Sequence, residues 1–97
     1  MVVLVVGATG TVGTYAVESL LAVSLKVRVL ARSKASAYAK FGDAVEIVEG
    51  DYDDIGKAVV GVEKVLLITP STPEQPIIEE KIAVAAKHAG VTLLVKV

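Results

Sequence analysis

Three glycines, Gly7, Gly10 and Gly13, follow the uninterrupted apolar run 2–6 and lead into a helical pattern. A turn this tight between a buried strand and a helix needs a residue that tolerates positive φ, which Gly7 supplies. Gly10 lets the backbone approach a pyrophosphate, and Gly13 lets the helix pack closely on the strand. The free N–H groups and the dipole at the helix start attract an anion. The spacing predicts a dinucleotide-binding turn, and an ordinary strand-to-helix turn is the alternative interpretation.

Arg32 stands where an NAD-specific site usually has an acidic residue that holds the ribose 2′-hydroxyl. A cation there suits a 2′-phosphate instead, with Ser33 and Lys34 as additional donors. The sequence therefore favours NADP over NAD as the cofactor. The alternative is a solvated cation at the end of a strand.

Three further polar residues each have a functional and a structural interpretation. Asp51 could accept a hydrogen bond from the adenine amino group, or it could act in a turn or cap with Asp53 and Asp54. Thr69 could bind the cofactor or satisfy the local backbone at a strand end. His88 lies in the last turn of a predicted helix, where a cation stabilises the dipole, and we expect a structural role.

The sequence contains no recognisable catalytic residues. Tyr15, Tyr38 and Tyr52 all lack a lysine four positions on, so the Tyr-x-x-x-Lys pair of related reductases is missing. The acidic residues show no spacing that suggests a metal site. The basic residues form no stripe with aromatic residues, so we expect no nucleic-acid partner.

Short apolar runs alternate with helical patterns along the whole chain. The predicted strands are 2–6, 26–31, 45–48, 65–69 and 92–97, and the predicted helices are 11–23, 34–40, 53–60 and 76–89. Asp53 or Asp54 is expected to cap the third helix, and Gly61 to end it. The expected apolar faces are Val12, Ala16, Leu20 and Val23 in the first helix and Ile78, Ile82, Ala85 and Ala89 in the last.

This alternation predicts a single α/β domain over residues 1–97, a doubly wound, Rossmann-like parallel sheet with helices on both faces. The expected strand order is 3-2-1-4-5. Its switch point falls beside the first strand, where ligands bind at the carboxyl ends of the strands. Topology and the glycine motif therefore indicate the same site.

Composition limits the other classes of function. Hydrophobic residues make up 54% of the chain, which fits strands buried on both faces, and the formal net charge is −1. No apolar run is long enough to span a membrane, and no bulk charge attracts nucleic acid or an anionic surface. Cysteine is absent, which excludes disulfides and thiolate chemistry. We expect a cytoplasmic protein without a membrane partner.

The fifth predicted strand carries Leu93, Leu94, Val95 and Val97 at an edge of the sheet. An exposed apolar edge favours pairing with another chain, so we expect a homo-oligomer. The chain ends in or directly after this strand. We therefore expect the N-terminal part of a larger fold, or a shortened or engineered minimal version of one.

Several segments together resemble the atypical short-chain dehydrogenase/reductases, especially the NmrA-like group. These segments are GATGTVG at 7–13, VLAR at 29–32, EGDYDD at 49–54, LITP at 67–70 and AAKHAGV at 85–91. The resemblance covers this whole chain and roughly the first third of a family member. It implies an NAD(P)H-binding Rossmann fold, found in quinone and dye reductases and in non-catalytic redox sensors.

The resemblance also implies roles for individual residues. The pyrophosphate would contact Gly7, Thr9, Gly10, Thr11 and Val12; the ribose would contact Arg32, the adenine Asp51 and Tyr52, and the nicotinamide side Thr69 and Pro70. Two features depart from the family. The stretch 22–25 lacks the usual glycine after the first helix, and the stretch 55–62 is short.

The family's catalytic positions lie beyond the fifth strand. Hydride transfer to a small electrophile such as a quinone therefore requires further C-terminal residues. The alternatives are a non-catalytic NADP(H)-sensing module and a truncated or engineered Rossmann scaffold without activity.

Overall fold

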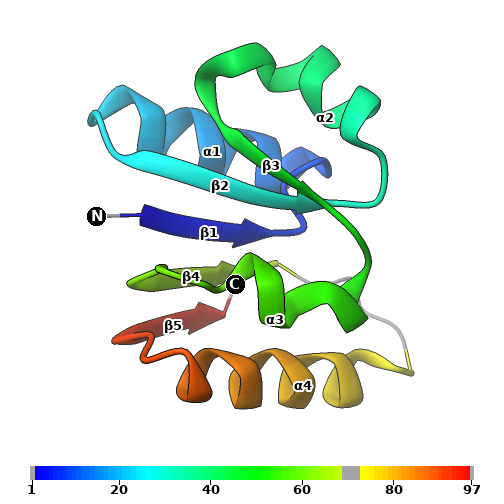
Figure 1. The fold of residues 1–97 in the computed structure, drawn as a ribbon. Helices are drawn as coiled ribbons and strands as arrows, with labels where there is room; N and C mark the ends of the chain where they lie inside the picture. The colour runs from blue at the N-terminus through cyan, green and yellow to red at the C-terminus, as the bar shows by residue number, and fades with distance from the viewer. Residues whose placement is uncertain (1, 69–72, 97) are drawn as a thin grey trace.

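The computed structural model describes residues 2–68 and 73–96. Five parallel strands form one sheet in the order β3-β2-β1-β4-β5 (Figure 1), which confirms the predicted class and strand order. The strands are β1 (Val2–Val6), β2 (Lys26–Ala31), β3 (Glu46–Glu49), β4 (Lys64–Leu67) and β5 (Leu93–Lys96). The predicted bounds agree to within one or two residues, the usual uncertainty at element ends.

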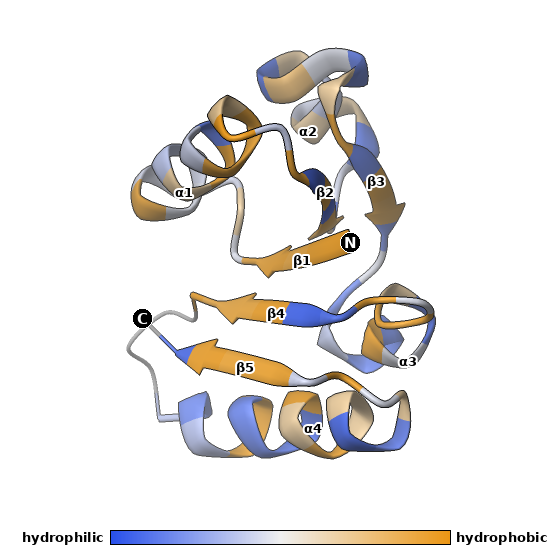
Figure 2. Cartoon of the chain, turned by 90° about the vertical axis from the view of Figure 1, so that its left-hand side faces the viewer, coloured by the Kyte–Doolittle hydropathy of each residue, from blue (hydrophilic) through white to orange (hydrophobic). Residues whose placement is uncertain are grey.

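Helices connect the strands and cover both faces of the sheet. They are α1 (Thr11–Ala22), α2 (Lys34–Phe41), α3 (Ile55–Ala58) and α4 (Gln75–His88), with short 3-10 turns at Gly42–Ala44 and Tyr52–Asp54. Figure 2 shows α1 and α3 on opposite sides of the sheet. The third helix is only four residues long, as the short stretch 55–62 suggested.

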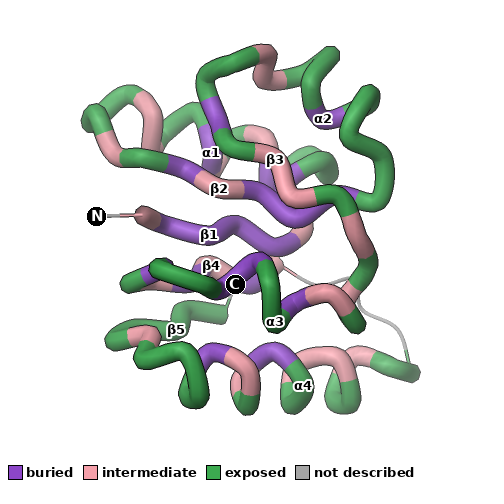
Figure 3. Tube along the Cα trace, viewed as in Figure 1, coloured by how far each residue is buried: buried purple, intermediate pink, exposed green. Residues whose placement is uncertain are grey.

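Alternate residues of β1 supply two separate cores. Leu4 and Val6 pack against α4 through Ile82, whereas Val5 packs against α1 through Val17. A strand buried on both faces must be apolar at every position, which explains the continuous run 2–6. Burial falls from the central strand β1 to the exposed edge strand β5 (Figure 3).

The predicted apolar face of α1 is wrong at its two ends. Val12 and Val23 are 54% and 65% exposed, whereas Gly13 and Val17 are buried and Leu20 is partly buried. The cause is the close approach of Gly13 to the turn after β1, which rotates the i, i+4 row beginning at Gly13 toward the sheet. Apolar periodicity alone missed this row because glycine carries no hydrophobic side chain.

The apolar face of α4 is mostly as predicted. Ile82 is buried, and Ile78 and Ala85 pack against the same core. Ala86 takes the last buried position in place of Ala89, which is the exposed C-cap residue. No described helix is both long enough and apolar enough to cross a membrane.

Helix α1 ends in a Schellman motif without glycine. Ser24 has φ of 63°. The Ser24 N–H donates to the Leu21 carbonyl at 3.0 Å, and the Leu25 N–H donates to the Leu20 carbonyl at 3.2 Å. Glycine is favoured at such a left-handed position because a Cβ is strained there. The turn therefore keeps its geometry at the cost of backbone strain at Ser24.

Candidate functional site

Two of the three glycines after β1 are required by the fold itself. Gly7 has φ of +88°, and a Cβ there would overlap the carbonyl oxygen of Ile68. A Cβ at Gly13 would overlap the carbonyl oxygen of Gly7. The chain therefore reverses tightly at Gly7, and α1 lies against the turn at Gly13, as the glycine spacing predicted.

Gly10 differs, because the fold does not require glycine there. Its φ and ψ are −75° and 174°, an extended conformation open to any residue. A Cβ added to Gly10 would meet only the Gly7 carbonyl oxygen, at 3.8 Å. The missing side chain instead leaves the start of α1 open on its outer side, which is what a ligand approaching the backbone would need.

The start of α1 offers hydrogen-bond donors to a ligand. Gly10 is the N-cap residue and has no side chain that could accept a hydrogen bond, so the first N–H groups of the helix receive no side-chain cap there. Thr14 stabilises the turn, since its one hydroxyl proton is shared between the carbonyls of Ala8 at 3.2 Å and Gly10 at 2.8 Å. Sequence reasoning missed Thr14, although a threonine in a first helical turn often bonds the backbone behind it.

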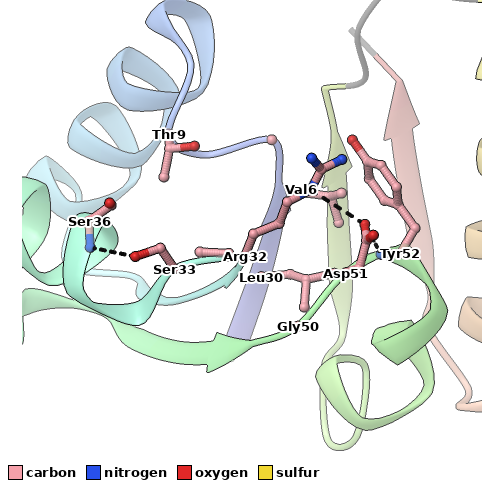
Figure 4. Close-up of a pocket in the computed structure, with 11 residues that line it drawn as sticks. Val6, Thr9, Leu30, Arg32, Ser33, Ser36, Gly50, Asp51 and Tyr52 are labelled. Carbon is pink, nitrogen blue, oxygen red and sulfur yellow. Dashed lines mark hydrogen bonds and ion pairs between the residues drawn. The ribbon is translucent and has the colours of Figure 1, made fainter.

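A pocket of about 380 Å³ lies beside this turn, at the carboxyl ends of β1, β2 and β3 (Figure 4). Six of the predicted site residues line it, namely Gly7, Thr9, Arg32, Ser33, Asp51 and Tyr52. The pocket wall also includes Val6, Leu30, Ala31, Ser36 and Gly50, which sequence reasoning did not assign. Thr11, Val12 and Gly13 lie in the first turn of α1. Thr69 and Pro70 lie outside the described residues.

Arg32 and Asp51 form an ion pair at the mouth of the pocket. Arg32 Nε lies 3.6 Å from Asp51 Oδ1, and the two side chains are 77% and 57% exposed. Figure 4 shows Arg32 directed toward Asp51 and Tyr52, away from Ser33. Both charges therefore remain accessible to a ligand.

Asp51 also begins the 3-10 turn that follows β3. Its carboxylate accepts a hydrogen bond from the Tyr52 N–H at 2.7 Å, and its own N–H donates to Asp54 Oδ2 at 2.9 Å. The predicted cap is correct in position only: Asp54 is the N-cap residue of α3 but makes no side-chain cap hydrogen bond there. Asp51 instead caps the preceding 3-10 turn, and Asp54 completes its reciprocal capping box. Asp53 instead pairs with Lys81 of α4.

The junction between β2 and α2 forms another wall of the site. The Ser33 side chain caps α2 by accepting from the Ser36 N–H at 3.2 Å. The Lys34 N–H donates to Glu49 Oε2 at 2.9 Å. One backbone N–H at the start of α2 is thus already bonded to a carboxylate from the end of β3.

The pocket combines an apolar floor with charged groups at its mouth. Leu30 and Ala31 form part of its lining, and the Arg32–Asp51 pair lines it as well. Within residues 2–68 and 73–96, no three histidine, aspartate or glutamate side chains gather as a metal site. His88 lies in the last turn of α4, where a cation is favourable to the helix dipole.

The sequence model of the NmrA-like family matches residues 1–95, nearly the whole chain. The chain belongs to the NmrA-like family.

Two characterised proteins are similar to this NmrA-like chain in sequence. It is 36% identical over 92 residues to the NAD(P)H azoreductase of Xenophilus azovorans, across 92% of this chain and 32% of that protein. It is 33% identical over 96 residues to quinone oxidoreductase 2 of Escherichia coli strain K12, across 93% of this chain and 34% of that protein. The chain therefore spans about a third of the length of the relatives it matches.

Solved structures of reductases are also similar to this chain. The NADPH-dependent quinone oxidoreductase of Escherichia coli, complexed with NADPH, superposes with a TM-score of 0.87 at 30% identity, over 97% of this chain and 35% of that one. The Citrobacter sp. triphenylmethane reductase, complexed with NADP(H), superposes with a TM-score of 0.84 at 27% identity, over 99% of this chain and 36% of that one. The Rossmann-like fold is thus shared with dinucleotide-bound reductases.

Proposed function

We propose that this chain is the NAD(P)H-binding domain of an NmrA-like oxidoreductase. The observation that carries the proposal is Gly10, where the fold tolerates a side chain but the sequence has none. A pyrophosphate at the helix start would occupy that space. The azo, quinone and triphenylmethane reductases that resemble the chain support the same assignment.

The proposed cofactor lies across the carboxyl ends of the strands. The pyrophosphate contacts the backbone of residues 7–13 and the side chain of Thr9. The adenosine enters the pocket between Arg32 and the Asp51–Tyr52 turn, over the apolar floor of Leu30 and Ala31. Thr69 and Pro70 remain our proposal for the nicotinamide side.

The bound cofactor would supply a hydride to a small electrophile such as a quinone. In this proposal the chain's own residues bind and orient. The turn after β1 fixes the pyrophosphate, and the pocket fixes the adenosine. We assign no catalytic residue within this chain, so the proposal for its own residues is limited to binding and orienting the cofactor.

We propose NADP as the preferred cofactor. Arg32 lies at the end of β2, where its guanidinium can reach a phosphate on the adenosine ribose. Ser33 lines the same pocket and keeps a hydroxyl proton to donate while its oxygen caps α2.

A second part of the proposal concerns association through the free edge of β5. Leu93, Leu94 and Val95 are 46%, 37% and 42% exposed, and β5 is the last strand of the sheet. An edge of this kind can pair with a second copy of the chain. Sedimentation of the wild type should show concentration-dependent dimers that the Val95→Lys variant lacks, and a monomer at every concentration would refute the pairing.

Calorimetric titration with NADPH and NADH tests the proposed function. The wild-type chain should bind NADPH more tightly than NADH, and Arg32→Gln should weaken NADPH binding selectively. Lys40→Gln, which removes a cation from the last turn of α2 outside the pocket, is the matched control and should change neither affinity.

Two outcomes would favour a different function. Absence of binding by a folded wild-type chain would leave a Rossmann scaffold without a cofactor. Binding coupled to recruitment of a partner protein, without reduction of any acceptor, would favour an NADP(H) sensor.

A further inference from the structure

Two carboxylates, at and just after the end of β3, contact groups that would bind a ribose 2′-phosphate. Asp51 Oδ1 lies 3.6 Å from Arg32 Nε. Glu49 Oε2 accepts from the Lys34 N–H at 2.9 Å, at the start of α2. The cation and the first backbone donor of α2 therefore each have an anion already.

Asp51 cannot move away from Arg32 without also breaking hydrogen bonds of the turn that it caps. The same carboxylate oxygen, Oδ1, accepts the Tyr52 N–H at 2.7 Å, and the Asp51 N–H is held by Asp54. The carboxylate is thus fixed beside the pocket by the turn it caps. A 2′-phosphate on Arg32 would bring about two more negative charges next to it, whereas a 2′-hydroxyl would bring none.

We propose that Asp51 and Glu49 are specificity-determining residues that offset the attraction of Arg32 for NADPH, so that the site also accepts NADH. The inference rests on the proposed function. It explains why one acidic side chain contacts Arg32 and another contacts the backbone donor at the start of α2. Removal of either carboxylate charge shifts the site toward NADPH.

The test compares Asp51→Asn and Glu49→Gln with the wild type by calorimetric titration. Both variants retain an oxygen acceptor, and asparagine caps as well as aspartate, so the turn should persist. The measured quantity is the ratio of the NADH Kd to the NADPH Kd. This ratio should rise about twofold to fivefold in each variant at low salt, because the interaction between two exposed charges changes affinity by at most about fivefold.

Asp53→Asn is the matched control, because it makes the same charge change two residues after Asp51. Asp53 pairs with Lys81 of α4 rather than with Arg32 or the Lys34 N–H, and its side chain is 81% exposed. Its ratio should remain that of the wild type. The effect at Asp51 and Glu49 should shrink in about 1 M salt, where the screening length falls to about 3 Å.

Three results would overturn the inference. An unchanged ratio in both variants of a chain that binds both nucleotides would refute it and leave the proposed function standing. An equal rise in Asp53→Asn would show an effect of net charge alone. A folded wild type that binds neither nucleotide would overturn the proposed function as well, with circular dichroism showing that each protein is folded.

Discussion

Replacing Gly10 with valine is expected to abolish dinucleotide binding while leaving most of the stability of the domain. The residue adopts φ of −75° and ψ of 174°, which suit a branched side chain, and a Cβ would stay 3.8 Å from the Gly7 carbonyl oxygen. The main loss of stability comes from the N-cap of α1, where valine is poorer than glycine by about 1 kcal/mol.

The loss of binding should be much larger. The valine side chain would stand where the pyrophosphate meets the start of α1 and would separate it from the helix N–H groups. Each charge-assisted hydrogen bond contributes about 1.5–3 kcal/mol, so loss of two corresponds to at least about a hundredfold in Kd. The variant should therefore separate binding from folding.

Gly13→Ala is expected to reduce stability more than Gly10→Val does. Its Cβ would overlap the Gly7 carbonyl oxygen, so α1 must move away from the turn, at about 3 kcal/mol. Urea denaturation gives the two free energies of unfolding, and calorimetry gives the two affinities. Retained NADPH binding in Gly10→Val, or equal destabilisation by the two substitutions, would refute the reasoning.

Three stability predictions follow from local geometry, each measured by urea denaturation against the wild type. Ser24→Gly should stabilise the chain by about 1 kcal/mol, since it relieves the strain of φ 63°, and an unchanged midpoint would contradict that strain. Arg28→Met should cost about 2 kcal/mol, because Arg28 Nη1 donates to the carbonyls of Ala58 at 2.8 Å and Val60 at 2.6 Å. Asp54→Ala should cost about 1 kcal/mol through the lost capping box, and a neutral result would show that water replaces it.

The fold was predictable because the hydrophobic pattern and the order of strands and helices indicate the same topology. The run 2–6 is apolar at every position, which indicates a central parallel strand, and β1 is that strand. The rule that crossovers are right-handed then leaves few topologies for five strands. The orientation of α1 was harder, because its contact with the sheet begins at a glycine rather than at an apolar side chain.

The glycine turn was predictable because backbone geometry decides it. A Cβ at Gly7 would overlap the Ile68 carbonyl oxygen, and a Cβ at Gly13 would overlap the Gly7 carbonyl oxygen. The Arg32–Asp51 pair could not be read from the sequence, because two residues far apart in the chain meet only once β2 and β3 are paired. The internal hydroxyl of Thr14 was missed for a similar reason, since only the folded turn brings the Ala8 carbonyl to it.

The most direct test of dinucleotide binding at the turn after β1 is titration of the ¹⁵N-labelled chain with NADPH, followed by NMR. The proposed site predicts that the largest amide shifts fall on Gly10, Thr11, Val12 and Gly13, with smaller ones at Arg32 and Asp51. Shifts confined to other parts of the sheet, such as β5, or no shifts at millimolar NADPH, would contradict the account.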